Sequence, residues 1–124
     1  MTFSTDQKNA AARALRSALP GLDLGVARAW VTCEQGDNFN FLGLTNAQGL
    51  LKFASFDAAA VAYAKILTWA YVYRGIAESL GKDKNLQARA IVRSPWHLGA
   101  AGLAAHGGVD PYYQRIFRSL GFAV

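Results

Sequence analysis

Apolar side chains recur at intervals of three and four residues along most of this chain, which places them on one face of an α-helix. Capping residues, glycines and prolines divide the pattern into segments, and Gly36 is expected to stop the second of them. The helices predicted in this way span residues 4–19, 24–34, 55–80, 84–93, 98–105 and 110–121. The third segment is long enough to be one buried helix or two helices that are broken near residues 68–71.

One stretch lacks the helical spacing. Residues 37–49 contain Gly, Asn and Asp at short intervals, which is typical of a loop, and residues 50–53 form at most a short strand. Helices that pack on helices follow from this pattern. We therefore predict a mainly α fold with at most a minimal β-hairpin. With 124 residues, the chain has the size of a single domain over residues 1–124.

The composition narrows the class of protein. An apolar content of 52% is typical of a globular chain and argues against disorder. No apolar run reaches the ~20 residues that a membrane-spanning helix needs, so we expect no membrane span. The first residues lack the basic start and apolar core of a signal peptide, so action outside the cytoplasm would require another route of delivery.

The net charge of +5 favours polyanionic partners, of which nucleic acid and anionic cell wall are two. The basic residues are scattered and no nucleic-acid motif is present, so a nucleic-acid partner is not expected. Cys33, His97 and His106 lack the short spacings of metal ligands, and we expect neither a metal nor a cofactor. We interpret Cys33 as a small buried residue.

The chain has eight carboxylates, and most have a structural explanation. Glu78 lies four residues before Lys82, the spacing of a surface ion pair. Four others stand at predicted helix starts, where a carboxylate favours the helix: Asp23, Asp57, Asp83 and Asp110.

Glu34 is different because it ends an apolar helix and shares a helix face with Trp30 and Ala27. A carboxyl against an aromatic wall is poorly solvated, which raises its pKa and suits it to act as a general acid. A Glu at a helix end that is exposed to water fits the same periodicity, so the spacing alone leaves both interpretations open.

The segment after Glu34 resembles the active-site stretch of the lysozyme-like glycosidases, most closely the bacterial and phage glucosaminidases and muramidases. In that superfamily, a Glu at the end of a buried helix precedes a loop that reads Asn-apolar-apolar-Gly-apolar, which corresponds here to residues 40–44. The gap between the Glu and the Asn is shorter here than in the glucosaminidases. Further matches follow in the family's order at residues 51–57 and 58–67, at Ser94-Pro95-Trp96 and at Asp110-Pro111-Tyr112-Tyr113.

The resemblance implies a lysozyme-like domain that cleaves bacterial peptidoglycan, with Glu34 as the catalytic acid. It implies that Asn40 holds its loop or contacts sugar, in a loop that forms one wall of a cleft. Asp37 is the candidate in sequence for a second carboxylate. The place of action would be the bacterial cell wall, reached with a virion or by another route. A non-catalytic structural or wall-binding part of a phage or secretion assembly is the alternative, because a fold does not fix a function.

Three aromatic residues are each open to two interpretations. Trp96 lines a sugar cleft or packs in the core, while Tyr73 and Tyr112 bind substrate through their hydroxyls or are buried rings. We expect Trp30 and Trp69 in the core. His97 is expected to be exposed or to support the site rather than to act in it.

Overall fold

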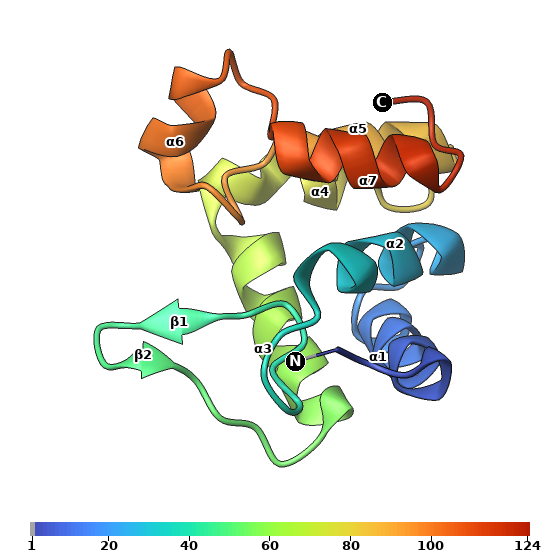
Figure 1. Cartoon of the computed structure of the whole chain (residues 1–124), viewed down its shortest axis with the longest axis vertical. Coiled ribbons are helices and arrows are strands. Elements are labelled where there is room, and N and C mark those ends of the chain that lie inside the picture. Colours follow the sequence, from blue (N-terminus) through green and yellow to red (C-terminus); the bar gives the residue numbers. More distant parts are fainter. Residues whose placement is uncertain (1) are drawn as a thin grey trace.

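The computed structural model describes residues 2–124 and confirms the mainly α fold with a minimal hairpin (Figure 1). The described residues contain seven helices and one two-stranded antiparallel sheet. The helices are α1 (Thr5–Ala18), α2 (Leu24–Glu34), α3 (Phe56–Trp69), α4 (Arg74–Ser79), α5 (Lys84–Val92), α6 (Gly99–Ala105) and α7 (Pro111–Ser119). A short 3-10 helix, η1 (Tyr71–Tyr73), joins α3 to α4.

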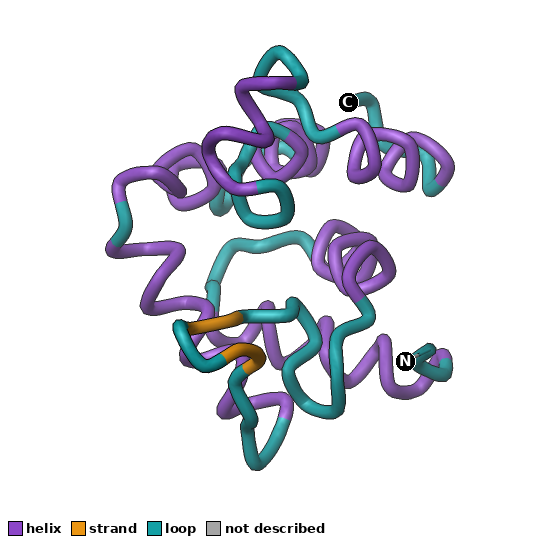
Figure 2. The backbone as a smooth tube through the Cα atoms, turned by 60° about the vertical axis from the view of Figure 1, so that its left-hand side comes forward, coloured by secondary structure: helices purple, strands orange, loops and turns teal. Residues whose placement is uncertain are grey.

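The hairpin pairs β1 (Thr45–Asn46) with β2 (Gly49–Leu50), which are the orange strands of Figure 2, and in Figure 1 it projects from the helical body. The strand predicted at residues 50–53 therefore begins one residue earlier and ends at Leu50. All four strand residues are exposed, so the hairpin adds nothing to the core.

Helix α2 is central and buried, as its apolar sequence predicts. Figure 1 shows it between α1 on one side and α5 and α7 on the other, and it packs against all three. Trp30 is fully buried, as expected, and Cys33 is buried too. The buried side chains of α2 are Val26, Ala27, Ala29, Trp30, Val31 and Cys33. The last residue of this helix, Glu34, is thereby carried to the edge of the core.

Side-chain caps fix where the helices begin. Ser4 forms a reciprocal capping box with Gln7 at the start of α1, and Asp57 lies in the first turn of α3. Such a cap is typically worth ~0.5–2 kcal/mol. The side chains that accept a backbone N–H at a helix start are Ser4, Asp23, Ser55, Asp83 and Asp110. The helix starts predicted from these residues are confirmed.

The long apolar segment is two helices, because the chain becomes extended at Ala70 and leaves α3. The prediction that Trp69 is a core residue is wrong, since its side chain is 88% exposed. Leu67 is buried, and a residue two positions further along a helix points to the opposite face.

The predicted pair of Glu78 with Lys82 is also wrong. Helix α4 ends at Ser79, so Lys82 lies outside the helix that would align the two side chains. Glu78 pairs instead with Arg74, one turn earlier, across 3.3 Å. No helix in residues 2–124 combines the length and the apolar character that crossing a bilayer requires.

Candidate active site

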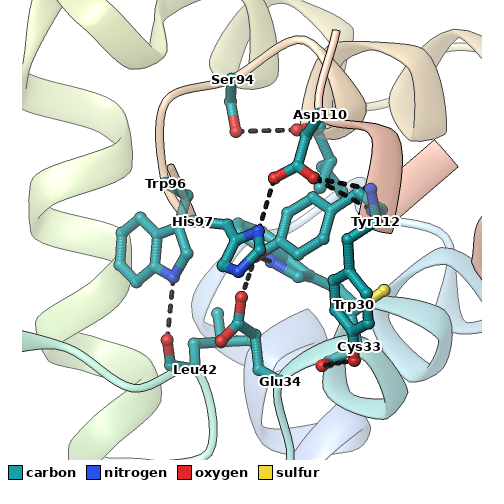
Figure 3. A network of polar contacts seen from close by, with 11 residues as sticks. Trp30, Cys33, Glu34, Leu42, Ser94, Trp96, His97, Asp110 and Tyr112 are labelled. Atoms are coloured by element: carbon teal, nitrogen blue, oxygen red, sulfur yellow. Dashed lines mark hydrogen bonds and ion pairs between the residues drawn. The ribbon is translucent and has the colours of Figure 1, made fainter. Parts of the chain in front are cut away.

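Glu34 stands at the junction of α2 and α7, where a chain of hydrogen bonds holds its carboxyl (Figure 3). The hydroxyl of Tyr113 donates to Oε1 of Glu34. The indole Nε1–H of Trp30 donates in turn to the Tyr113 oxygen over 3.1 Å. Both aromatic side chains are fully buried, so the carboxyl is oriented by groups that cannot move independently of the core.

Burial raises the pKa of Glu34 above its ordinary value of 4.5, in the direction that the sequence predicted. The hydrogen bond from Tyr113 and the electrostatic influence of the nearby His97 both favour the ionised form and oppose this rise. The negative charge of Asp110 adds to it. The loss of hydration outweighs the favourable contacts, so the group retains its proton to a higher pH than an exposed Glu does.

Asn40 holds the loop that follows Glu34. Its side chain is 1% exposed and accepts from the backbone N–H of Leu44 and, at 2.6 Å, from the Tyr63 hydroxyl. Its amide nitrogen donates to the carbonyls of Leu44 and Leu51 at 2.8 and 2.9 Å. Of the two roles predicted for Asn40, the structure shows the first, and a side chain covered to this degree does not contact sugar.

Two glycines bring this loop against the end of α2. The prediction that Gly36 stops α2 is wrong, because Gln35 takes the left-handed conformation with a φ of 38°. Gly36 is needed for a different reason, since a Cβ there would lie 1.9 Å from the carbonyl oxygen of Asn40. At Gly43, which has a φ of 69°, a Cβ would lie 3.7 Å from Oε2 of Glu34. The loop therefore lies beside Glu34, and its expected role as one wall of a cleft stays a prediction.

Trp96 packs against the core more than it faces solvent. Its ring meets those of Trp30 and Tyr63 edge-on with centroids 5.7 Å apart, and Tyr73 lies 5.5 Å away. Its Nε1–H donates to the carbonyl of Leu42 over 2.9 Å, which ties the loop to the segment after α5. Tyr73 is half-buried against Trp96, and this burial raises the pKa of its hydroxyl.

Tyr112 and Asp37 lie at different places relative to Glu34. The Tyr112 hydroxyl donates to the backbone carbonyl of Cys33 over 2.8 Å, so its proton is used within the protein. Asp37 is exposed, and its backbone carbonyl accepts from the N–H of Asn40. Among the described residues, no hydrogen bond joins the Asp37 carboxylate to Glu34. Sequence proximity alone suggested Asp37 as a partner for Glu34.

Comparisons with protein-family models, curated proteins and solved structures found no match. The resemblance to the lysozyme-like glycosidases thus remains a prediction. Within residues 2–124, no three side chains of the metal-ligating types come together. The side chains of the site supply carboxyl, imidazole and hydroxyl groups.

The structure adds a pair that sequence reasoning did not join. Nδ1 of His97 lies 2.7 Å from Oδ2 of Asp110, and the two residues are 13 positions apart in a segment that contains α6. Asp110 was explained fully by its capping role, which occupies only its Oδ1. The His97 ring stacks on Tyr113 with centroids 5.2 Å apart. Tyr113 appears in the sequence as part of the Asp-Pro-x-Tyr motif, but nothing in the motif reveals that its hydroxyl reaches Glu34.

Proposed function

We propose that this chain is a glycosidase of bacterial peptidoglycan in which Glu34 is the general acid. One observation carries the proposal: a half-buried carboxyl with a raised pKa, held in a fixed orientation beside a braced loop. A carboxyl with a raised pKa keeps its proton to a higher pH than an exposed Glu does, and it can deliver that proton to the glycosidic oxygen as the bond to the sugar breaks. The glycan strands of the wall would be its partner, and the wall its place of action.

The hydrogen bonds identify the oxygen that carries the proton. The Tyr113 oxygen already accepts from Trp30, so its own hydrogen is directed to Oε1 of Glu34. The acidic proton therefore belongs on Oε2, the oxygen on the side of Gly43. Since Gly43 has no side chain, this residue places only backbone atoms near Oε2. A substrate would be protonated from that side.

Replacing Glu34 by Gln tests the role of the carboxyl. Gln keeps the shape and can still accept from Tyr113, but it has no acidic proton. General acid catalysis typically contributes ~10²–10⁴-fold, so Glu34→Gln is expected to lose cleavage of purified walls by about that factor. Asp37→Asn is the matched control, and it should lose much less because its carboxylate is exposed and apart from the Tyr113 network.

Turbidity of wall suspensions and release of reducing sugar ends measure the cleavage, and circular dichroism checks that both variants are folded. Full activity in Glu34→Gln would remove Glu34 from the mechanism. A lack of cleavage by the unmutated chain on several wall types would favour the second candidate.

That candidate is a non-catalytic structural or wall-binding component of a phage or secretion assembly. The Tyr113–Glu34 hydrogen bond favours it, because a contact that ties α7 to α2 stabilises the fold whether or not any bond is cut. The two candidates differ in a simple measurement. An enzyme releases soluble fragments from walls, whereas a binding protein sediments with intact walls and releases none.

A further inference from the structure

Asp110 is placed to orient an imidazole. Its side chain is 0% exposed, and Oδ1 accepts from the backbone N–H groups of Tyr112 and Tyr113 at 3.0 and 3.2 Å. Its own N–H donates to the carbonyl of Val92, which fixes the backbone at the same point. Oδ2 is left for Nδ1 of His97 at 2.7 Å. A buried carboxylate of this kind holds the proton of a neutral imidazole on Nδ1 and leaves Nε2 as a proton acceptor.

The imidazole lies next to the group that holds Glu34. The His97 side chain is 34% exposed and stacks almost parallel on Tyr113, at an interplanar angle of 14°. Tyr113 donates its hydroxyl to Glu34, so the imidazole and the carboxyl contact the same side chain. In Figure 3, the His97 ring lies between Asp110 and Glu34.

The groups that face this imidazole come from two helices. At the start of α7 these are the cap residue Asp110 and the rings of Tyr112 and Tyr113, and α2 contributes Glu34 at its end. The guanidinium of Arg115 lies over the Tyr112 ring on the side of α7. The His97 imidazole is thus a basic group beside two carboxyls and two tyrosine rings.

We propose that His97, oriented by Asp110, is the second acid–base group of this site and acts as the general base. The inference rests on the proposed glycosidase function. In the reaction, Glu34 Oε2–H gives its proton to the leaving oxygen as the bond from the anomeric carbon to that oxygen breaks. A hydroxyl, either water or the substrate's own 6-hydroxyl, forms the new bond to the anomeric carbon and gives its proton to Nε2 of His97. Return of this proton to Glu34 through solvent restores the starting state.

This assignment supplies the second group that Asp37 does not. Paired-carboxylate glycosidases place a second carboxylate across the scissile bond. Here Asp37 is exposed and has no hydrogen bond to Glu34, whereas His97 is joined to Glu34 through Tyr113. Asp110 is a positioning residue, since it is fully buried and acts through the imidazole.

His97→Gln and His106→Gln form a matched pair, because His106 is exposed and lies after α6. His97→Gln is expected to lower the rate of wall cleavage by ~10²–10⁴-fold, while His106→Gln leaves it unchanged. In the unmutated chain, the rate should fall at acid pH as the base becomes protonated, and this limb should disappear in His97→Gln. Added imidazole should restore part of the rate in His97→Ala, and more basic imidazoles should restore more of it.

Each outcome has a separate meaning. Loss of cleavage in Glu34→Gln with full cleavage in folded His97→Gln overturns the role of His97 and leaves the glycosidase proposal standing. A lower rate in His97→Gln with an unchanged pH profile and no rescue by imidazole also overturns it, since that is the behaviour of a structural residue. A lack of cleavage by the unmutated chain overturns both proposals. Asp110→Asn keeps the helix cap without the charge, and it should lower the rate less than His97→Gln does.

Discussion

Glu34 is subject to opposite demands from folding and from the proposed chemistry. Its position at the end of a buried helix removes water from the carboxyl, and this disfavours the charged form that a free Glu has at neutral pH. Tyr113 offsets part of that cost without cancelling it. The residue is therefore expected to lower the stability of the folded chain at neutral pH, as residues in active sites often do.

The pH dependence of stability tests this cost. The pKa of Glu34 is higher in the folded chain than in the unfolded chain, so the unfolded state loses its proton first as the pH rises. Stability from this group is then lost from about pH 4, the value for a free Glu, up to the raised pKa. Glu34→Gln should melt at a higher temperature than the unmutated chain at pH 7–8, and the difference should vanish below about pH 4.

Thermal melts followed by circular dichroism across this pH range make the measurement. Glu78→Gln is the control, since that carboxylate is exposed and pairs only with Arg74 on the surface. A difference between Glu34→Gln and the unmutated chain that is the same at every pH would contradict the prediction.

The sequence predicted a poorly solvated carboxyl at Glu34 but not the hydrogen bond from Tyr113, and both outcomes have the same physical reason. The spacing to Trp30 and Ala27 is local, so helix periodicity places these three residues on one face without any knowledge of the tertiary fold. The contact with Tyr113 joins residues 79 positions apart. The ring of Trp96 is half-buried against the core and its indole N–H donates to the backbone of the loop, while the cleft-lining role offered by the sequence stays a prediction.

At the scale of elements, the loop after α2 is held together by hydrogen bonds from the Asn40 side chain to its backbone rather than by a β-sheet. That side chain pairs with the N–H and carbonyl of Leu44 and with the carbonyl of Leu51, beside the single backbone hydrogen bond from Leu51 to Leu44. Tyr63 then connects the amide to α3, and its hydroxyl also accepts from the N–H of Leu42. The shape of the loop beside Glu34 thus depends on one buried side chain.

Asn40→Ala should be strongly destabilising for this reason. It would leave several buried donors and acceptors without partners, each at a typical cost of ~1–3 kcal/mol, and we expect a loss of about 2–5 kcal/mol in the free energy of unfolding. Asn46→Ala is the control, because Asn46 is exposed and accepts only from the N–H of Gln48 in the hairpin. Urea unfolding measures both. Equal urea midpoints for the two variants would show that the Asn40 side chain does not stabilise the loop.

The helices were predictable because their starts are encoded locally, by side chains that cap the adjacent turn. The wrong predictions concern residues whose surroundings depend on the tertiary fold and not on the adjacent sequence. Gly36 was interpreted as a helix stop, yet its lack of a Cβ serves the approach of Asn40. Trp69 was placed in the core by its type, although α3 ends there and turns it outward.

At the scale of the whole molecule, the fold of this chain of net charge +5 brings together arginines that are scattered in the sequence. Arg13 of α1 and Arg28 of α2 line one hollow, and Arg13 with Arg16 lines a second beside it. These arginines lie on helices that are separate in sequence and adjacent in the fold. Such a surface attracts anionic polymers of a cell wall without any specific site.

Binding to walls should therefore weaken as salt rises, since exposed charges are screened beyond ~8 Å at physiological ionic strength. A variant with Arg13→Gln, Arg16→Gln and Arg28→Gln should bind less at low salt and should respond less to added salt. Sedimentation of the protein with purified walls over a series of NaCl concentrations measures this. Salt-independent binding by the unmutated chain would indicate that uncharged contacts dominate.

The hydrogen bond from the Tyr112 hydroxyl to the carbonyl of Cys33 joins α7 to the end of α2. The cysteine can therefore report when these two helices separate. Cys33 is the single cysteine, and burial raises the pKa of its thiol, so a thiol reagent reacts only while the end of α2 is parted from α7. The rate of thiol labelling then measures how often the end of α2, next to Glu34, becomes accessible to solvent. Tyr112→Phe should accelerate labelling, and Tyr71→Phe, on an exposed ring, should not.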